Sequence, residues 1–219
     1  FFNVMEIKGF IFDVDGTLVN STPLHFKAWE NTLTKLNIHL TPPEIFKEFG
    51  KTPLEVAQAY LLERPDLDPT TVMHQKNDYF LEHIADLVIF PYVGEFLTLL
   101  HQKGIKFVLA SNGARNSIIK MTETFEFLGY SQGIVAFEDV THGKPHPEMI
   151  LKGIKHLNMN PQYVCMVGDS IYDIQAGQAA HVHTVAIPRE EHGQDFSSLQ
   201  PDYVFSDFHE LETLIPYLS

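Results

Sequence analysis

The chain has 219 residues, of which 15 are Lys or Arg and 28 are Asp or Glu, so its formal net charge is −13 with His neutral. Hydrophobic residues make up 44% of the chain, an ordinary globular composition that excludes disordered and collagen-like proteins. Because the acidic charge repels nucleic-acid phosphates and no basic run offsets it, no nucleic-acid partner is expected.

Short runs rich in Val, Ile and Phe predict the strands of one sheet. Most are apolar throughout and stop at a small or acidic residue, which is typical of parallel strands that are covered on both faces. In chain order they are 9–12, 105–110, 133–137, 163–167, 183–187 and 203–205. Helical patterns lie between them at 93–102, 114–128, 147–156 and 173–180. This alternation predicts an α/β fold with a doubly wound, Rossmann-like parallel sheet.

Residues 22–89 interrupt this alternation, because they contain helical patterns and no convincing strand. Four apolar residues share one face of the helix predicted at 25–36: Phe26, Trp29, Leu33 and Leu36. Prolines predict helix starts at 42 and 53, and a fourth helix is predicted at 71–87. The block is too long for a loop. We expect an all-helical cap domain at 22–89, inserted into a core domain of residues 1–21 and 90–219.

Nothing in the sequence indicates an oxidising compartment or a membrane. The single cysteine, Cys165, can form no internal disulfide, and its apolar neighbours predict a buried, reduced thiol. No apolar stretch approaches the roughly 20 residues that cross a bilayer, and residues 1–12 lack the pattern of a secretory signal. We expect a cytoplasmic protein without a membrane partner, either a monomer or a homodimer, with a polar surface loop at 188–201.

The predicted core strands end at polar residues, namely Asp13, Asp15, Ser111, Asn112 and Asp169. In an open α/β sheet, ligands bind outside the carboxyl ends of the strands, near the point where the strand order reverses. We therefore expect these side chains to converge on one crevice. Lys144, in the turn 143–147, and Asp173 are placed to reach the same crevice.

Four carboxylates in one crevice would raise each other's pKa unless a cation intervened. Because the available ligands are oxygens, Mg²⁺ is the expected cation, and Lys144 would add a second positive charge. This arrangement favours phosphoryl transfer. With an ordinary pKa of about 4, Asp13 would be an ionised nucleophile, and Asp15 would protonate the leaving oxygen and then activate water. The expected phosphate-binding groups are Ser111, Lys144 and the backbone amides near Gly16 and Asn112.

Four motifs carry a resemblance to a known family. They are FDVDGTL at 12–18, SNG at 111–113, GKP at 143–145 and GDSIYD at 168–173. In this order they resemble the motifs of the haloacid dehalogenase-like hydrolases, over residues 12–177. The resemblance implies a Mg²⁺-dependent phosphohydrolase that forms an aspartyl-phosphate.

The resemblance also assigns roles to individual residues. It makes Asp13 the nucleophile and a metal ligand, and Asp15 the general acid and base that also offers its backbone carbonyl to the metal. Asp169 would be a further metal ligand. The phosphate would be bound by Ser111 and Lys144, and the supporting residues would be Thr17 and Asp173, the latter at the metal site or paired with Lys144. Because the dehalogenases lack an acid at the position of Asp15, cleavage of carbon–halogen bonds is not expected.

The start of the predicted cap narrows the resemblance to one subgroup of the family. HFKAW at 25–29 resembles the cap of the β-phosphoglucomutase and phosphoglycolate phosphatase-like subgroup. The mutases carry an arginine three residues after the cap-loop glycine, where this chain has Pro53, although Lys51 is close in sequence. We therefore expect a phosphatase for a small phosphorylated metabolite, such as a sugar phosphate, with a phosphosugar mutase as the alternative. The candidate specificity residues are His25, Lys51 and Thr52.

Other interpretations stay open. A phosphorylatable signalling module also combines acidic residues, Mg²⁺ and lysine, but it would lack the helical insertion. Ser111 and Asp173 are also placed to cap helices, and His25, Lys51 and Thr52 would equally suit an exposed surface. His142 and His146 have a zinc-like spacing, as do His181 and His183, but no third ligand is evident and surface histidines are expected.

Overall fold

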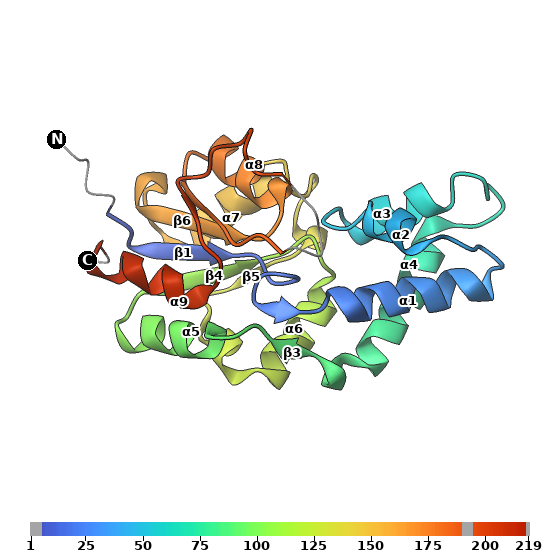
Figure 1. Ribbon diagram of the computed structural model, residues 1–219, viewed down its shortest axis with the longest axis horizontal. Helices are drawn as coiled ribbons and strands as arrows, with labels where there is room; N and C mark the ends of the chain where they lie inside the picture. The colour runs from blue at the N-terminus through green and yellow to red at the C-terminus, as the bar shows by residue number, and fades with distance from the viewer. Residues whose placement is uncertain (1–5, 190–194, 218–219) are drawn as a thin grey trace.

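The computed structural model describes residues 6–189 and 195–217. Its core is a six-stranded sheet in the order β5-β4-β1-β6-β7-β8, in which neighbouring strands are parallel (Figure 1). The strands are β1 (Gly9–Phe12), β4 (Lys106–Ala110), β5 (Ile134–Val135), β6 (Val164–Gly168), β7 (His183–Ala186) and β8 (Tyr203–Val204). The predicted α/β fold with a doubly wound parallel sheet is confirmed.

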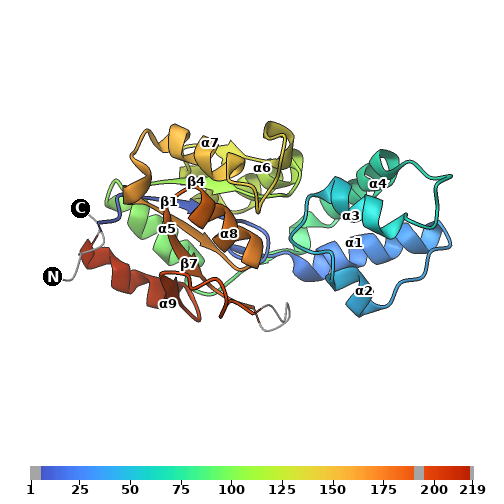
Figure 2. The ribbon, with the colours of Figure 1, turned by 90° about the horizontal axis from the view of Figure 1, so that it is seen from above.

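Helices cover both faces of the sheet, because alternate strand residues point to opposite sides. Phe10 and Phe12 of β1 join one apolar cluster with α5 (Val93–Gln102), α6 (Arg115–Thr124) and α9 (Phe208–Leu211). Ile11 joins a second cluster with α7 (Glu148–Leu157) and α8 (Ile171–Ala179). Figure 2 shows α8 and α7 lying over the strands. All three β1 side chains are fully buried, and each burial contributes about 1.5–3 kcal/mol.

The strand order brings the ends of β1, β4 and β6 together at the centre of the sheet. After β1, the chain adds β4 and then β5 on one side of β1. It then returns to the other side of β1 and adds β6, β7 and β8 in turn. Ligands bind at such a reversal in open α/β sheets. Asp13, Ser111 and Asp169 directly follow these three strands, so the fold delivers them to the reversal point.

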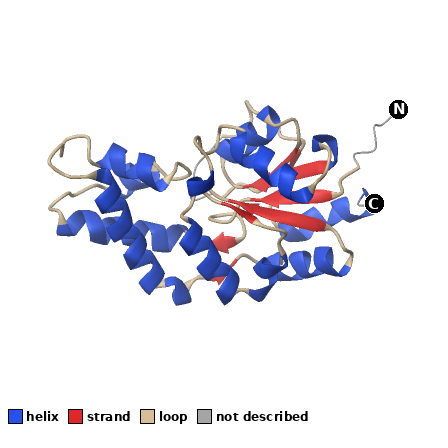
Figure 3. Ribbon diagram, turned by 180° about the vertical axis from the view of Figure 1, so that it is seen from behind, coloured by secondary structure: helices blue, strands red, loops and turns tan. Residues whose placement is uncertain are grey.

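The insertion forms a helical layer beyond the carboxyl ends of the strands (Figures 1 and 3). Its helices are α1 (Thr22–Lys35), α2 (Pro42–Phe46), α3 (Pro53–Tyr60) and α4 (Pro69–Glu82). They share an apolar core of their own, which includes Trp29, Leu33, Ile45, Val56 and Val72. The α4 helix begins at Pro69 because the Asp68 side chain accepts a hydrogen bond from the Thr71 backbone N–H at 3.0 Å. The domain boundaries at 21/22 and 89/90 stay a prediction.

The two linkers between sheet and cap pair with each other. Strands β2 (Val19–Asn20) and β3 (Val88–Ile89) form a short antiparallel ladder, and the Phe90 N–H donates to the Leu18 carbonyl at 3.1 Å. The expectation that residues 22–89 contain no strand is therefore wrong at β3. Two residues are too few to show a period of two in the sequence.

Arg189 holds the same linkers from the core side. Its guanidinium lies 3.6 Å from the centroid of the Phe90 ring. It also donates hydrogen bonds to the backbone carbonyls of Gly16 at 2.9 Å and Thr17 at 3.0 Å. One side chain therefore contacts both chain crossings between core and cap.

In three places a 3₁₀ helix takes up part of a predicted element. The helix predicted at 114–128 ends at Thr124, because Phe125 is extended, and the 3₁₀ helix η2 (Glu126–Tyr130) follows. The strand predicted at 133–137 shrinks to β5, because η3 (Phe137–Asp139) starts there. The helix predicted at 71–87 is α4 followed by η1 (Ile84–Asp86). The described residues also form the 3₁₀ helices η4 (Pro161–Tyr163) and η6 (Glu212–Tyr217).

Two further expectations concern the surface. Of the loop predicted at 188–201, residues 190–194 lie outside the described residues, as do residues 1–5 of the N-terminal segment. Across the parts of the chain that are described, every helix is too short or too polar to span a bilayer.

Cys165 is fully buried, and burial raises the pKa of its thiol.

Candidate active site

Lys144 joins two carboxylates at the reversal point of the sheet. Its Nζ lies 2.6 Å from Oδ1 of Asp13 and 2.6 Å from Oδ1 of Asp173, and it donates to the Ala110 carbonyl at 2.9 Å. All three charged groups are buried. Burial alone would lower the pKa of Lys144, but the two carboxylates outweigh it and raise that pKa. Lys144 is therefore a permanent cation at the base of the site.

Thr17 links the first and fourth motifs. Its hydroxyl lies 2.9 Å from Oδ2 of Asp13 and 2.6 Å from Oδ1 of Asp169. Carboxylate oxygens of Asp13, Asp169 and Asp173 all lie within 4.8 Å of one another. Gly16 permits this approach, because its φ is +85° and a Cβ there would lie 2.6 Å from Oδ2 of Asp169. The buried oxygen cluster has the donor set that a hard divalent cation prefers.

The charge state of Asp13 differs from the sequence-based expectation. Burial raises the pKa of the Asp13 carboxyl well above its usual range, and the neighbouring carboxylates of Asp173, Asp169 and Asp15 add to this effect, while Lys144 opposes it. The expectation of an ordinary pKa is therefore wrong for Asp13 in the chain by itself. A desolvated carboxyl needs positive charge beside it to stay ionised.

Asp173 both caps a helix and contacts the site. Its Oδ2 accepts hydrogen bonds from the Ser170 hydroxyl at 2.6 Å and the Ser170 N–H at 3.0 Å, which forms a capping box at the start of α8. Its Oδ1 faces Lys144. Both sequence interpretations of Asp173 therefore apply: Oδ2 caps the helix, and Oδ1 pairs with Lys144.

Asp15 accepts hydrogen bonds from both the core and the start of the cap. Its Oδ1 lies 2.7 Å from the Ser21 hydroxyl and 3.0 Å from Nε2 of His25, and its Oδ2 lies 3.0 Å from the Ser111 hydroxyl. Burial raises the pKa of Asp15, but His25 and the two hydroxyls outweigh burial and lower it below its usual range. Ser111 also accepts from the Gly113 N–H at 2.8 Å. It does not cap α6, whose N-cap position is Ala114.

Lys76 is a residue of the site that the sequence did not single out. Its Nζ lies 2.6 Å from Nδ1 of His25, and the side chain is only 4% exposed. Its ammonium also lies 4.9 Å from the Phe80 ring centroid and 5.8 Å from that of Trp29. Burial lowers the pKa of Lys76 to about 8. Burial and the charge of Lys76 also lower the pKa of His25, against the opposing effect of Asp15.

Asn112 connects the core to the cap loop. Its side-chain amide donates to the Gly50 carbonyl at 2.8 Å and to the Lys144 carbonyl at 3.0 Å, and its Oδ1 accepts from the Lys144 N–H at 2.8 Å. Lys51, next to Gly50, is partly exposed and pairs with Glu48. Thr52 lies at the N-cap of α3, where its hydroxyl meets Glu55.

A cavity of about 100 Å³ lies between the cap and the core. The core contributes the charged groups described above, and the cap contributes His25, Lys51, Lys76 and the apolar side chains of Trp29, Phe49 and Val56. The structure therefore brings every predicted site residue except Gly16, Thr17 and Thr52 to the wall of one cavity. Gly16 and Thr17 lie directly behind that wall, against Asp169.

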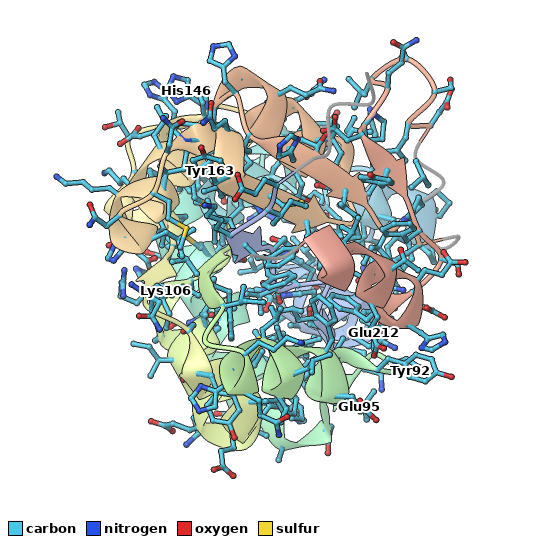
Figure 4. All side chains as sticks on the ribbon, turned by 90° about the vertical axis from the view of Figure 1, so that its left-hand side faces the viewer. Tyr92, Glu95, Lys106, His146, Tyr163 and Glu212 are labelled. Carbon is cyan, nitrogen blue, oxygen red and sulfur yellow. The ribbon has the colours of Figure 1, made fainter. Side chains whose placement is uncertain are left out.

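The histidine pair at 142 and 146 lies outside this cavity. Both side chains are exposed, and Figure 4 shows His146 at the surface of the core. Glu148 offers a third ligand atom within 4.8 Å, which the sequence spacing had not revealed. Its Oε2 is already held by the backbone N–H groups of Thr141 and His142, so it serves the loop that carries Lys144.

Comparisons with known proteins agree with this geometry. The pyrophosphatase PpaX of Oceanobacillus iheyensis is 29% identical over 96% of this chain and 98% of its own length. A phosphoglycolate phosphatase of Salmonella typhimurium is 26% identical over 95% of this chain and 92% of its own. The structure of CbbY from Rhodobacter sphaeroides with phosphate has a TM-score of 0.85 at 20% identity, and covers 94% of this chain and 96% of that one.

A β-phosphoglucomutase from Clostridium difficile shares the fold as well, with a TM-score of 0.80 at 23% identity over 96% of each chain. Residues 10–187 match the family described as haloacid dehalogenase-like hydrolase. This match and the phosphatases among the relatives confirm the predicted enzyme class, a hydrolase of the phosphatase type. The chain therefore belongs to the haloacid dehalogenase-like hydrolase family.

Proposed function

We propose that the chain is a Mg²⁺-dependent phosphatase that hydrolyses a small phosphorylated metabolite through an aspartyl-phosphate on Asp13. The observation that carries the proposal is the contact of Lys144 with Asp13 and Asp173, at 2.6 Å each, at the reversal point of the sheet. A buried lysine beside carboxylates at this position suits phosphate binding. Relatives named pyrophosphatase and phosphoglycolate phosphatase support the same reaction class.

The acidic cluster suits Mg²⁺ because it offers oxygen ligands and needs positive charge. Burial raises the pKa of Asp13, and a nearby cation would stabilise the ionised form that attacks phosphorus. We assign the metal ligands to the carboxylates of Asp13 and Asp169 and the backbone carbonyl of Asp15, with Thr17 and Asp173 in support. Bound Mg²⁺ would neutralise the charge that moves during phosphoryl transfer.

We assign the other catalytic roles to residues of the chain itself. Asp13 attacks the phosphorus, while the phosphoryl oxygens are held by Ser111, Lys144 and the backbone amides near Gly16 and Asn112. Asp15 starts ionised, because its hydrogen bonds lower its pKa. The approach of a negatively charged phosphoryl group raises that pKa, so Asp15 takes up a proton from solvent and passes it to the leaving oxygen as the bond to phosphorus breaks. Ionised again, it takes a proton from the water that hydrolyses the aspartyl-phosphate.

The decisive variant is Asp13→Asn, which keeps the shape of the side chain and removes the nucleophile. We expect it to release no phosphate above background from p-nitrophenyl phosphate or from a panel of phosphorylated metabolites with Mg²⁺. Asp86→Asn is the matched control, because Asp86 is exposed at the end of η1. Circular dichroism would show that both variants fold. Turnover by Asp13→Asn close to that of the wild type would contradict the assignment.

Removal of metal tests the charge argument. We expect EDTA to stop phosphate release and added Mg²⁺ to restore it. Full activity after chelation would contradict the proposed role of the acidic cluster.

The alternative activities give different products. A mutase would convert β-glucose 1-phosphate to its 6-phosphate isomer without net phosphate release. Pro53 stands where a mutase carries arginine, and Lys51 is paired with Glu48, so we expect phosphate release instead. A signalling module would take up one phosphoryl group per chain and then stop, whereas we expect continuous turnover.

A further inference from the structure

Three lysines line the cavity between cap and core, and they differ in what balances their charge. Lys144 contacts Asp13 and Asp173, and Lys51 contacts Glu48. Lys76 is different: within residues 6–189 and 195–217, no carboxylate forms an ion pair with it. Its hydrogen-bond partner is the Nδ1 atom of His25.

This pattern is unusual because Lys76 is almost completely buried. Its side chain is 4% exposed, and its other neighbours are the aromatic rings of Phe80 and Trp29. Buried charges in proteins are normally paired, because desolvation of an unpaired ion is costly. Lys76 lines the cavity, so a ligand in the cavity can supply the missing negative charge.

The position of Lys76 indicates which part of the ligand it would meet. Lys144 and the acidic cluster lie on the core side, where the phosphoryl group is proposed to bind. Lys76 lies on the cap side and is separated from Asp15 by the His25 ring, which contacts Lys76 through Nδ1 and Asp15 through Nε2. The leaving oxygen is proposed to face Asp15. An anion beside Lys76 would therefore sit only a few bonds beyond that oxygen, within the leaving group.

We infer that Lys76 is a binding site for a carboxylate or phosphate on the leaving group, so that the substrate is a small phosphate compound with an anionic leaving group. This inference rests on the proposed phosphatase function. Neutral sugar leaving groups would leave Lys76 unpaired in the closed cavity. The apolar contacts from Trp29, Phe49 and Val56 limit the size of the group that fits beside it.

The test compares substrates that differ only in charge. 2-Phosphoglycolate and its carboxamide have nearly the same shape, and inorganic pyrophosphate offers a phosphate in place of the carboxylate. We expect wild-type kcat/KM to be about tenfold or more higher for 2-phosphoglycolate than for the amide. Pyrophosphate would show whether phosphate serves as well as carboxylate. Equal values for the acid and the amide, together with no turnover of pyrophosphate, would overturn the inference.

Variants then tie the preference to Lys76. We expect Lys76→Met to bring the acid-to-amide ratio of kcat/KM close to one and Lys76→Arg to retain part of it. Lys27→Met is the matched control, because Lys27 is exposed on α1 of the same cap, and it should keep the wild-type ratio. A wild-type ratio in folded Lys76→Met would overturn the inference. The wild-type substrate comparison needs no variant, so it decides the matter even if Lys76→Met fails to fold.

The same experiment separates the two levels of the proposal. If the wild type hydrolyses neither these compounds nor p-nitrophenyl phosphate, the phosphatase proposal fails. If it hydrolyses the amide and p-nitrophenyl phosphate as well as the acid and does not hydrolyse pyrophosphate, the phosphatase proposal stands and only the role of Lys76 is refuted.

Discussion

Replacement of Lys76 by methionine is expected to stabilise the folded protein near neutral pH. Burial lowers the pKa of Lys76 from 10.5 to about 8, which corresponds to a cost of about 3 kcal/mol for holding the charged form in the folded state. Methionine keeps the apolar stem and removes the charge. It also loses the hydrogen bond to His25, which contributes about 1 kcal/mol. We therefore expect a net gain of about 2 kcal/mol in the free energy of unfolding at pH 7.

The sign of the pH dependence follows from the two pKa values. Between pH 8 and pH 10.5 the unfolded chain still binds the Lys76 proton while the folded chain has lost it. The wild type therefore gains stability as pH rises through this window, and the methionine variant lacks that gain. All other groups titrate in both proteins, so the difference between them isolates Lys76. It should fall by about 3 kcal/mol from pH 7 to pH 10.5.

Urea unfolding followed by circular dichroism at both pH values measures this difference. Lys27→Met serves as the control, because its ammonium is exposed and its replacement should leave stability within about 0.5 kcal/mol at either pH. A Lys76→Met protein that is less stable than the wild type at pH 7, or a difference that does not change with pH, would refute the reasoning.

Two further substitutions each remove one hydroxyl group. Thr17→Val keeps the shape of the side chain but removes the hydroxyl between Asp13 and Asp169. We expect kcat to fall about tenfold, because the activation barrier rises by about 1.4 kcal/mol. A wild-type kcat in steady-state assays would contradict this. Tyr60→Phe removes a buried donor 2.5 Å from the Ile45 carbonyl; we expect about 1 kcal/mol less stability in urea unfolding, and an unchanged midpoint would show that this bond contributes little.

The sequence predicted the sheet and the acidic cluster well, because both depend on local signals. A buried parallel strand is a short apolar run, and the residue after it lies at the carboxyl end of the sheet whatever the rest of the chain does. Asp13, Ser111 and Asp169 could therefore be located without coordinates. The left-handed backbone at Gly16, with φ +85°, likewise belongs to a recognisable motif.

The contacts of the cap could not be predicted in the same way, because they depend on how two units pack. Lys76 lies among the buried positions of α4, with Val72, Met73 and Phe80. A lysine on an apolar helical face is the one local signal of a special role, but its partner His25 is 51 positions away in sequence. The pKa of Asp13 was misjudged for a related reason, since desolvation is set by everything that surrounds the group.

The chain passes between core and cap twice, and the pairing of these two linkers affects how firmly the cap is attached. The two linkers pair with each other through β2 and β3, and Arg189 contacts the residues next to both strands from the core side. Two chains fastened side by side resist twisting more than one chain does, so these contacts fix the orientation of the cap on the core. That orientation keeps His25 between Lys76 and Asp15, so the cap holds a cation at a constant distance from the acidic cluster.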